Sequence, residues 1–213
     1  MQLERRKEEI EKEVQKIYRD FREIYTKYRY PEWFNFCDKF NKNEGYGEEG
    51  FMDGRLGHEL RHYAILQTPI YEKREIIIVG NNNSWFIPNK YKMKESLKIV
   101  KALKENIPKE NFLTRNESEY SKSLGSYFQI LGEEAEKLFE RAIGINRLWI
   151  QTGSKCPPYY GKKEKDKCAI TEEMKSNPKF KKEWNNLVKK CEEWTMEIIE
   201  IINPKLVLLL SGS

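Results

Sequence analysis

The sequence predicts an α/β fold: a three-layer α/β/α sandwich with a short parallel sheet, preceded by an amphipathic helix. Apolar runs of strand length occur at 75–80, 145–153 and 205–212, and helical patterns lie between them. Strands that alternate with helices are typical of βαβ units, in which the strands pair in parallel. The 213 residues are enough for one such domain with a sizeable core.

Residues 2–29 carry the strongest helical pattern in the chain. Apolar side chains recur at three- and four-residue steps from Leu3 to Tyr28, and charged residues fill the positions between them. Pro31 is expected to end this helix, because a proline inside a helix removes one of its hydrogen bonds. The pattern predicts an N-terminal helix whose apolar stripe packs on the domain.

The segment 30–55 is rich in aromatic residues and glycine, and we expect it to be irregular. A short helix is expected to follow over 56–66. No internal repeat or interdomain linker stands out. We therefore divide the chain into an extension of residues 1–55, packed on the domain, and an α/β domain of residues 56–213.

Further helices are predicted between the strands. Residues 93–104 and 133–142 have helical patterns. Asn177 and Pro178 match an N-cap followed by a first-turn proline, and they predict a long helix that ends near Ile202. The apolar run that follows is expected to be a third buried strand.

The composition favours a cytoplasmic protein. Charged residues make up 34% of the chain, and no apolar run approaches the roughly 20 residues of a membrane helix. The N-terminus lacks the apolar core of a signal peptide. The four cysteines have no close pairing, unlike a secreted disulfide framework. We expect a monomer with no membrane partner.

The stretch GNNNSWF, Gly80 to Phe86, follows the first strand and raises the main functional question. In open parallel sheets, ligands bind beyond the carboxyl ends of the strands. The stretch lacks the glycine and lysine spacing of a phosphate loop or a dinucleotide-binding loop. Asparagine is common in turns, so a structural turn is one interpretation. The other is recognition of a planar heterocycle, because amides pair with base edges and aromatic rings stack on bases.

Three segments together resemble the uracil-DNA glycosylase superfamily. VGNNNSW is similar to its first motif, in which a hydrophobic strand ends in G-x-[N/D/A]-P-[G/Y]. GINRLWIQTGSKCPP is similar to its second strand, and EWTMEIIEIINPKLVLLLSGS to its helix and third strand. The segments follow the superfamily's order and span residues 75–213, roughly two-thirds of the chain.

The resemblance implies a mechanism. A uracil, or a related damaged base, would be flipped out of DNA into a pocket at the strand ends. Asn82 stands at the catalytic position and would hold a water against the sugar C1′, while Asn146 would read the uracil edge. An amide cannot deprotonate water at neutral pH, so the rate would come from placement and from stabilising the departing uracil anion. The other implied base-binding residues are Gly80, Asn81, Asn83, Ser84, Trp85 and Phe86.

DNA is the partner that the resemblance implies, and the charge is compatible with it. The net charge of +5 is a mild positive bias, and eleven lysines fall between Lys155 and Lys190. A solvated loop and helix face also explains such a run. The candidate DNA-contacting residues are Lys155, Lys162, Lys163 and Arg61.

Two departures from the family pattern bear on activity. Asn83 replaces the proline of the first motif, which removes a rigid turn. The sequence stops at Ser213, before the superfamily's fourth strand and second motif. The third strand is predicted to be a buried, central strand, which needs a neighbouring strand on each side. We therefore expect that the sequence is a fragment of a longer protein. A non-catalytic nucleic-acid-binding protein on the same fold is the first alternative.

The second alternative is a zinc peptidase. His58, Glu59 and His62 match H-E-x-x-H, which on a helix places two imidazoles on one face with a glutamate as general base. Arg61 adds a positive charge between the two ligands, and the chain has no third histidine. The structural interpretation is a pair of partly buried histidines on a helix.

An iron–sulfur cluster occurs in some members of the superfamily. Two cysteines here, Cys156 and Cys191, sit in comparable places, and Cys37 and Cys168 would complete a set of four. The close C-x-x-C pair of those families is missing, and the spacing fits no known cluster run. We therefore expect scattered thiols and neither a cofactor nor a metal.

Overall fold

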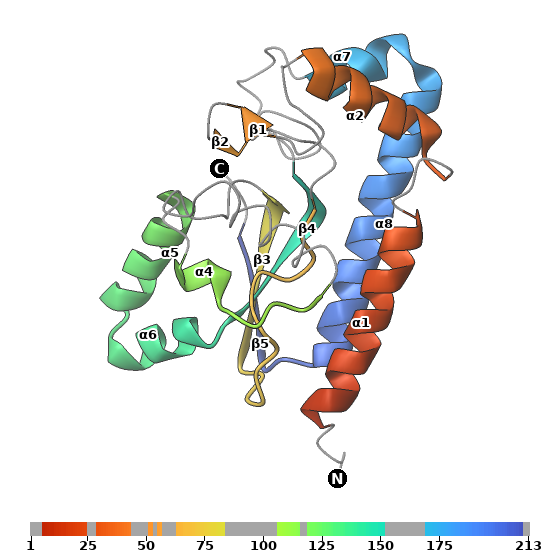
Figure 1. The fold of residues 1–213 in the computed structure, drawn as a ribbon. Coiled ribbons are helices and arrows are strands. Elements are labelled where there is room, and N and C mark those ends of the chain that lie inside the picture. Colours follow the sequence, from red (N-terminus) through yellow and green to blue (C-terminus); the bar gives the residue numbers. More distant parts are fainter. Residues whose placement is uncertain are drawn as a thin grey trace.

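The computed structural model shows a mixed α/β protein with a short parallel sheet (Figure 1). It describes residues 6–24, 29–43, 51–52, 55–56, 63–83, 106–115, 119–151 and 169–210. The described helices are α1 (Lys7–Ile24), α2 (Pro31–Asn43), α4 (Phe112–Arg115), α5 (Glu119–Ile130), α6 (Glu133–Glu140), α7 (Ala169–Ser176) and α8 (Pro178–Ile202). The described strands are β1 (Phe51–Met52), β2 (Arg55–Leu56), β3 (Ile76–Asn83), β4 (Ile143–Gln151) and β5 (Leu206–Leu209).

The main sheet has the strand order β4-β3-β5, and both pairings are parallel. β3 is central: Ile77 pairs with Ile143 of β4 and with Val207 of β5. The four side chains of Ile76–Val79 are all buried, as a continuous β-branched run predicts for a strand covered on both faces. The expected parallel α/β sheet is confirmed.

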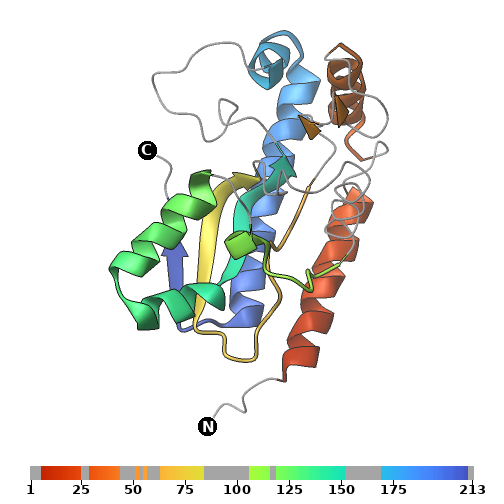
Figure 2. The same ribbon diagram turned by 60° about the vertical axis from the view of Figure 1, so that its left-hand side comes forward.

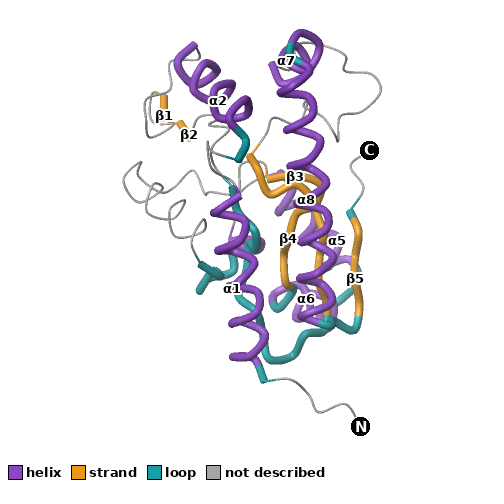
Figure 3. Tube along the Cα trace, turned by 90° about the vertical axis from the view of Figure 1, so that its right-hand side faces the viewer, coloured by secondary structure: helices purple, strands orange, loops and turns teal. Residues whose placement is uncertain are grey.

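Helices lie on both faces of this sheet (Figures 1 and 2). On one face α5 and α6 cover Ile76 and Ile78, and the stacked rings of Phe128 and Phe139, 4.9 Å apart, fill the interface. On the other face α8 and α1 lie side by side (Figure 3). Trp149 of β4 stacks there on Trp194 of α8, with ring centroids 5.8 Å apart.

The predicted N-terminal helix is present as α1, and its apolar stripe is buried. The Phe21 ring meets Trp149 edge-on, with ring centroids 4.9 Å apart. The Tyr18 hydroxyl accepts a hydrogen bond from the Leu66 backbone N–H at 3.1 Å. These contacts join α1 to the sheet as part of one core.

α8 begins and ends where the sequence predicts. The Asn177 side chain accepts a hydrogen bond from the Phe180 backbone N–H at 3.1 Å, which satisfies one free donor of the first turn. Pro178 occupies the first turn. At the other end Asn203, with φ of 49°, adopts the left-handed conformation that stops the helix and turns the chain toward β5.

The expectation that residues 30–55 are irregular is wrong. Pro31 opens α2, in which Trp33, Phe36 and Cys37 are buried at helical spacing against α8. β1 and β2 then pair antiparallel. The glycines after residue 44 suggested irregular structure for the whole segment. Before residue 44, however, apolar side chains recur at the three- and four-residue steps of a helix.

The expected helix over 56–66 is also wrong in its described part. Tyr63 and Leu66 form antiparallel bridges with Ile150 and Ile145 of β4, so this segment extends the sheet. Its side chains Tyr63 to Leu66 are all buried.

The third strand, expected to be buried, is largely exposed. Leu209 of β5 keeps 69% of its surface accessible, and Leu206 keeps 53%.

Among the described helices, none is both long and apolar enough to cross a membrane.

Candidate functional site

The carboxyl ends of β3 and β4 bring together two of the segments singled out from the sequence. Gly80 of β3 pairs with Asn146 of β4, and Asn82 pairs with Leu148 two residues later. Because the strands are parallel, both segments reach the same edge of the sheet. Asn82 and Asn146 thus lie on neighbouring strands, with Asn82 two residues beyond the partner of Asn146, which lies within β4.

The predicted loop begins later than expected. β3 continues through Asn81 and Asn82 to Asn83, which pairs with Gln151 after a register shift. The first two asparagines are therefore strand residues and not a turn, and Asn82 pairs with Leu148 of β4. Between Asn82 and Asn83 a β-bulge or other irregularity shifts the pairing register.

Asn146 lies in a buried polar network that ties β4 to α8. Its side chain is 5% exposed, and its backbone carbonyl accepts a hydrogen bond from the Thr195 hydroxyl at 3.1 Å. Thr195 in turn accepts the Trp149 indole N–H at 3.1 Å. Next to it, Arg147 forms an ion pair with Glu192 of α8. Three successive polar contacts fix this stretch of β4 against one helix.

A second buried amide, Gln67, was missed by the sequence analysis. Its backbone N–H donates to the Gly144 carbonyl at 2.8 Å, and the Gly144 N–H donates to the Thr68 hydroxyl at 3.0 Å. A Cβ built on Gly144 would lie 3.4 Å from the Gln67 side-chain oxygen, so the amide packs directly over this glycine. Alternation along β4 puts Gly144 and Asn146 on one face of the sheet. The only sequence signal was a Gln-Thr-Pro step after an apolar run.

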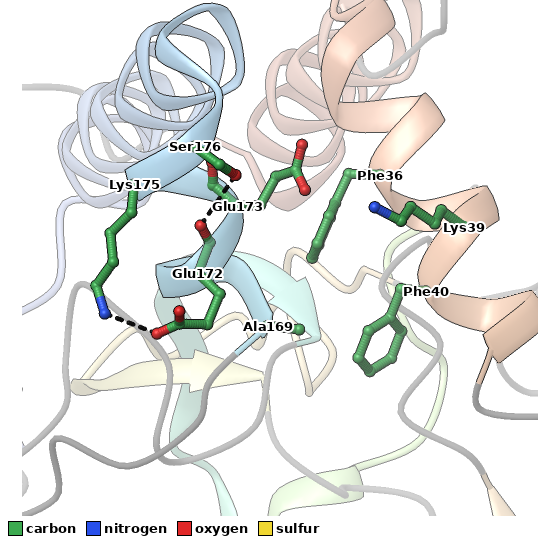
Figure 4. Close-up of a pocket in the computed structure, with 8 residues that line it drawn as sticks. All are labelled: Phe36, Lys39, Phe40, Ala169, Glu172, Glu173, Lys175 and Ser176. Atoms are coloured by element: carbon green, nitrogen blue, oxygen red, sulfur yellow. Dashed lines mark hydrogen bonds and ion pairs between the residues drawn. The ribbon is translucent and has the colours of Figure 1, made fainter.

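A groove of about 630 Å³ lies between α2 and α7 (Figure 4). Two phenylalanines, Phe36 and Phe40, form its apolar side. On α7, Lys175 forms an ion pair with Glu172 at 2.7 Å, so these two charges compensate each other. None of the described residues that are predicted to bind a base lines this groove.

The thiols of Cys37 and Cys191 are both buried in the core. Burial raises the pKa of Cys191 to about 12, which keeps it a neutral thiol and disfavours the thiolate that metals require. Within the part of the chain that the structure describes, no group of three or more His, Cys, Asp or Glu side chains is arranged to hold a metal ion.

Many predicted site residues lie outside the described residues. They are Ser84, Trp85, Phe86, Lys155, Lys162, Lys163, Arg61, His58, Glu59, His62, Cys156 and Cys168. The base-stacking, zinc and iron–sulfur predictions that depend on them therefore stay predictions. For Asn82 and Asn83, the pairing with β4 described above is a statement about the backbone alone.

No family model, curated protein or solved structure matches this chain.

Proposed function

We propose that this protein binds DNA and hydrolyses the N-glycosidic bond of a flipped uracil or related damaged base. The pairing of Gly80 with Asn146 carries the proposal, because it supports the two motif segments lying side by side on neighbouring parallel strands. The strand order β4-β3-β5 supports it further, since the three resembling segments occupy three adjacent parallel strands.

In the proposed reaction, Asn82 holds the attacking water and Asn146 pairs with the edge of the base. Gly80, the residue paired with Asn146 on the neighbouring strand, contributes no side chain there. The hydrogen bond from Thr195 to the Asn146 carbonyl holds the backbone at this position. Because an amide cannot accept the water's proton, placement of the water is the contribution of Asn82.

The test is base release from a uracil-containing oligonucleotide by the wild type, Asn82→Ala and Asn82→Asp. We expect Asn82→Ala to lose roughly 10²-fold in rate, because misplacement of a reacting group costs on that order. Asn82→Asp should retain or raise the rate, since a carboxylate both positions and deprotonates water. Asn35→Ala, which changes an exposed amide on α2, is the matched control and should leave the rate unchanged.

Absence of release from the wild type, with salt-sensitive DNA binding retained, would support the non-catalytic binding protein instead. Equal rates for Asn82→Ala and the wild type would remove Asn82 from the mechanism.

A further inference from the structure

α8 has an uneven distribution of charge along its length. The half from 178 to 190 carries five lysines and one glutamate, whereas the half from 191 to 202 carries four glutamates and neither lysine nor arginine. A 25-residue helix is about 37 Å long, so the two charge groups are well separated in space.

This distribution opposes the helix dipole. The first turn of a helix carries partial positive charge and favours acidic side chains, and the last turn favours basic ones. α8 has no acidic residue in its first turn and no basic residue in its last. Helix stability therefore does not explain why the lysines are where they are.

Three of the five lysines have no acidic partner within the described residues. Lys189 and Lys190 lie 3.7 and 3.1 Å from the Glu193 carboxylate, which neutralises much of their charge. The exposed side chains of Lys179, Lys181 and Lys182 form no ion pair in the part of the chain that the structure describes.

The single glutamate of this half does not compensate them. The Glu183 carboxylate accepts a hydrogen bond from the Trp33 backbone N–H at 3.0 Å, on the side of α8 that faces α2. Lys179, Lys181 and Lys182, which form no ion pair among the described residues, are here called the α8 lysine surface.

The α8 lysine surface lies at the end of the molecule where the candidate site is. α8 ends at Ile202, shortly before β5 begins at Leu206, so its acidic end is at the amino ends of the parallel strands. Its lysine-bearing start is consequently at the carboxyl ends, next to α7 and α2 (Figure 1). A polyanion drawn to this surface is brought to the carboxyl ends of the strands, where β3 ends one residue after Asn82.

Two classes of polyanionic partner are a nucleic acid and an anionic membrane. A helix that lies on a membrane needs a free apolar face to insert. The apolar face of α8 is already used, because Phe180, Trp184 and Leu187 are buried in the core. Lysines without an accompanying apolar face are typical of contacts to the phosphate backbone.

We propose that the α8 lysine surface binds backbone phosphates of DNA and orients the nucleic acid toward the carboxyl ends of the strands. This inference rests on the proposed function, and it adds a backbone-binding surface on a helix distinct from the base-binding strands.

The test compares DNA binding by two triple variants with the same change in charge. One is Lys179→Gln/Lys181→Gln/Lys182→Gln. The control is Lys12→Gln/Lys16→Gln/Lys73→Gln, which alters three exposed lysines on α1 and in the segment before β3. Affinity for a fluorescein-labelled duplex with one uracil is measured by anisotropy over a range of salt concentrations, and thermal melting monitored by circular dichroism verifies folding.

We expect the α8 variant to bind at least about tenfold more weakly at low salt. The slope of log affinity against log salt should become shallower by about 2 to 3, roughly one per lost phosphate contact. The control should stay within about twofold of the wild type, and Lys→Arg at the three α8 positions should restore binding.

Equal losses in both triple variants would overturn the inference, since net charge alone would then explain binding. An unchanged slope in the α8 variant would overturn it too, as would lysine-dependent binding to phosphatidylglycerol vesicles without binding to the duplex. A failure of the proposed function can be distinguished from a failure of this inference. If the wild type binds DNA through these lysines but releases no uracil, the inference stands and the hydrolysis is refuted.

Discussion

The two outer strands of the sheet, β4 and β5, are both apolar in sequence but differ in their surroundings. β4 pairs with β3 on one side and is bridged through Tyr63 and Leu66 on the other. α8 crosses it, with Thr195 bonded to the carbonyl of Asn146. β5 pairs with β3 alone among the described residues.

The difference shows that an apolar run predicts a strand but does not fix how much of it is buried. Trp149 of β4 is completely buried, whereas Leu209 of β5 is 69% exposed. Burial depends on what the rest of the chain places against each strand. α8 packs against β4, whereas Leu208 of β5 and Leu210 just after it are partly buried against the cluster formed with α5 and α6.

The largest effect is expected from truncating one apolar side chain on each strand. Trp149→Ala removes a buried indole and should lower the free energy of unfolding by roughly 3–5 kcal/mol. Leu209→Ala removes an exposed side chain and should change it by no more than about 0.5 kcal/mol. Urea unfolding of both variants measures the difference. Similar losses would mean that β5 is as enclosed as β4.

A smaller effect is expected from the polar link between β4 and α8. Thr195→Val removes the hydroxyl that bonds Trp149 and Asn146 and leaves the buried indole N–H without this acceptor. We expect a loss of about 1–3 kcal/mol in the free energy of unfolding. Thr114→Val, at an exposed position of α4, serves as the control and should be nearly neutral. A neutral Thr195→Val would show that this hydroxyl contributes little to holding the two elements together.

The smallest effect concerns the dependence of stability on pH. Burial raises the pKa of Cys191 from 9.0 to about 12, so the unfolded chain loses this proton at lower pH than the native chain does. The contribution of the neutral thiol is complete below pH 9 and is lost as pH rises from 9 toward 12. Stability should fall by up to about 1.4 kcal/mol per pH unit in this range.

The Cys191→Ala variant lacks the thiol, so its stability should not show this contribution to the fall with pH. The difference from the wild type measures the contribution of Cys191. Urea unfolding at pH 8, 9 and 10 should give a shallower decline for the variant than for the wild type. Parallel declines would mean that the thiol is titrated in the folded protein. The comparison stays at or below pH 10 because burial also raises the pKa of Tyr18.

The alternation of strands and helices made the parallel sheet predictable. The Asn177–Pro178 pair made the start of α8 predictable. Two kinds of feature were not predictable. α2 was not predicted because the nearby glycines indicated an irregular segment, although three of its side chains are buried at helical spacing. The polar network at Asn146 depends on Thr195, which is close in space but distant in sequence. For the candidate site, motif order indicated which strands meet, but only the pairing register places Gly80 beside Asn146.

The central position of β3 has a consequence for folding during synthesis. β3 is made early, yet Ile77 pairs with residue 143 on one side and with residue 207 on the other. Pairings so distant in sequence slow folding, because long loops must close before the contacts stabilise them. Until β5 emerges from the ribosome, one edge of an uninterrupted isoleucine–valine strand is open to pairing with other chains. This strand is therefore where we expect aggregation of the nascent protein to begin.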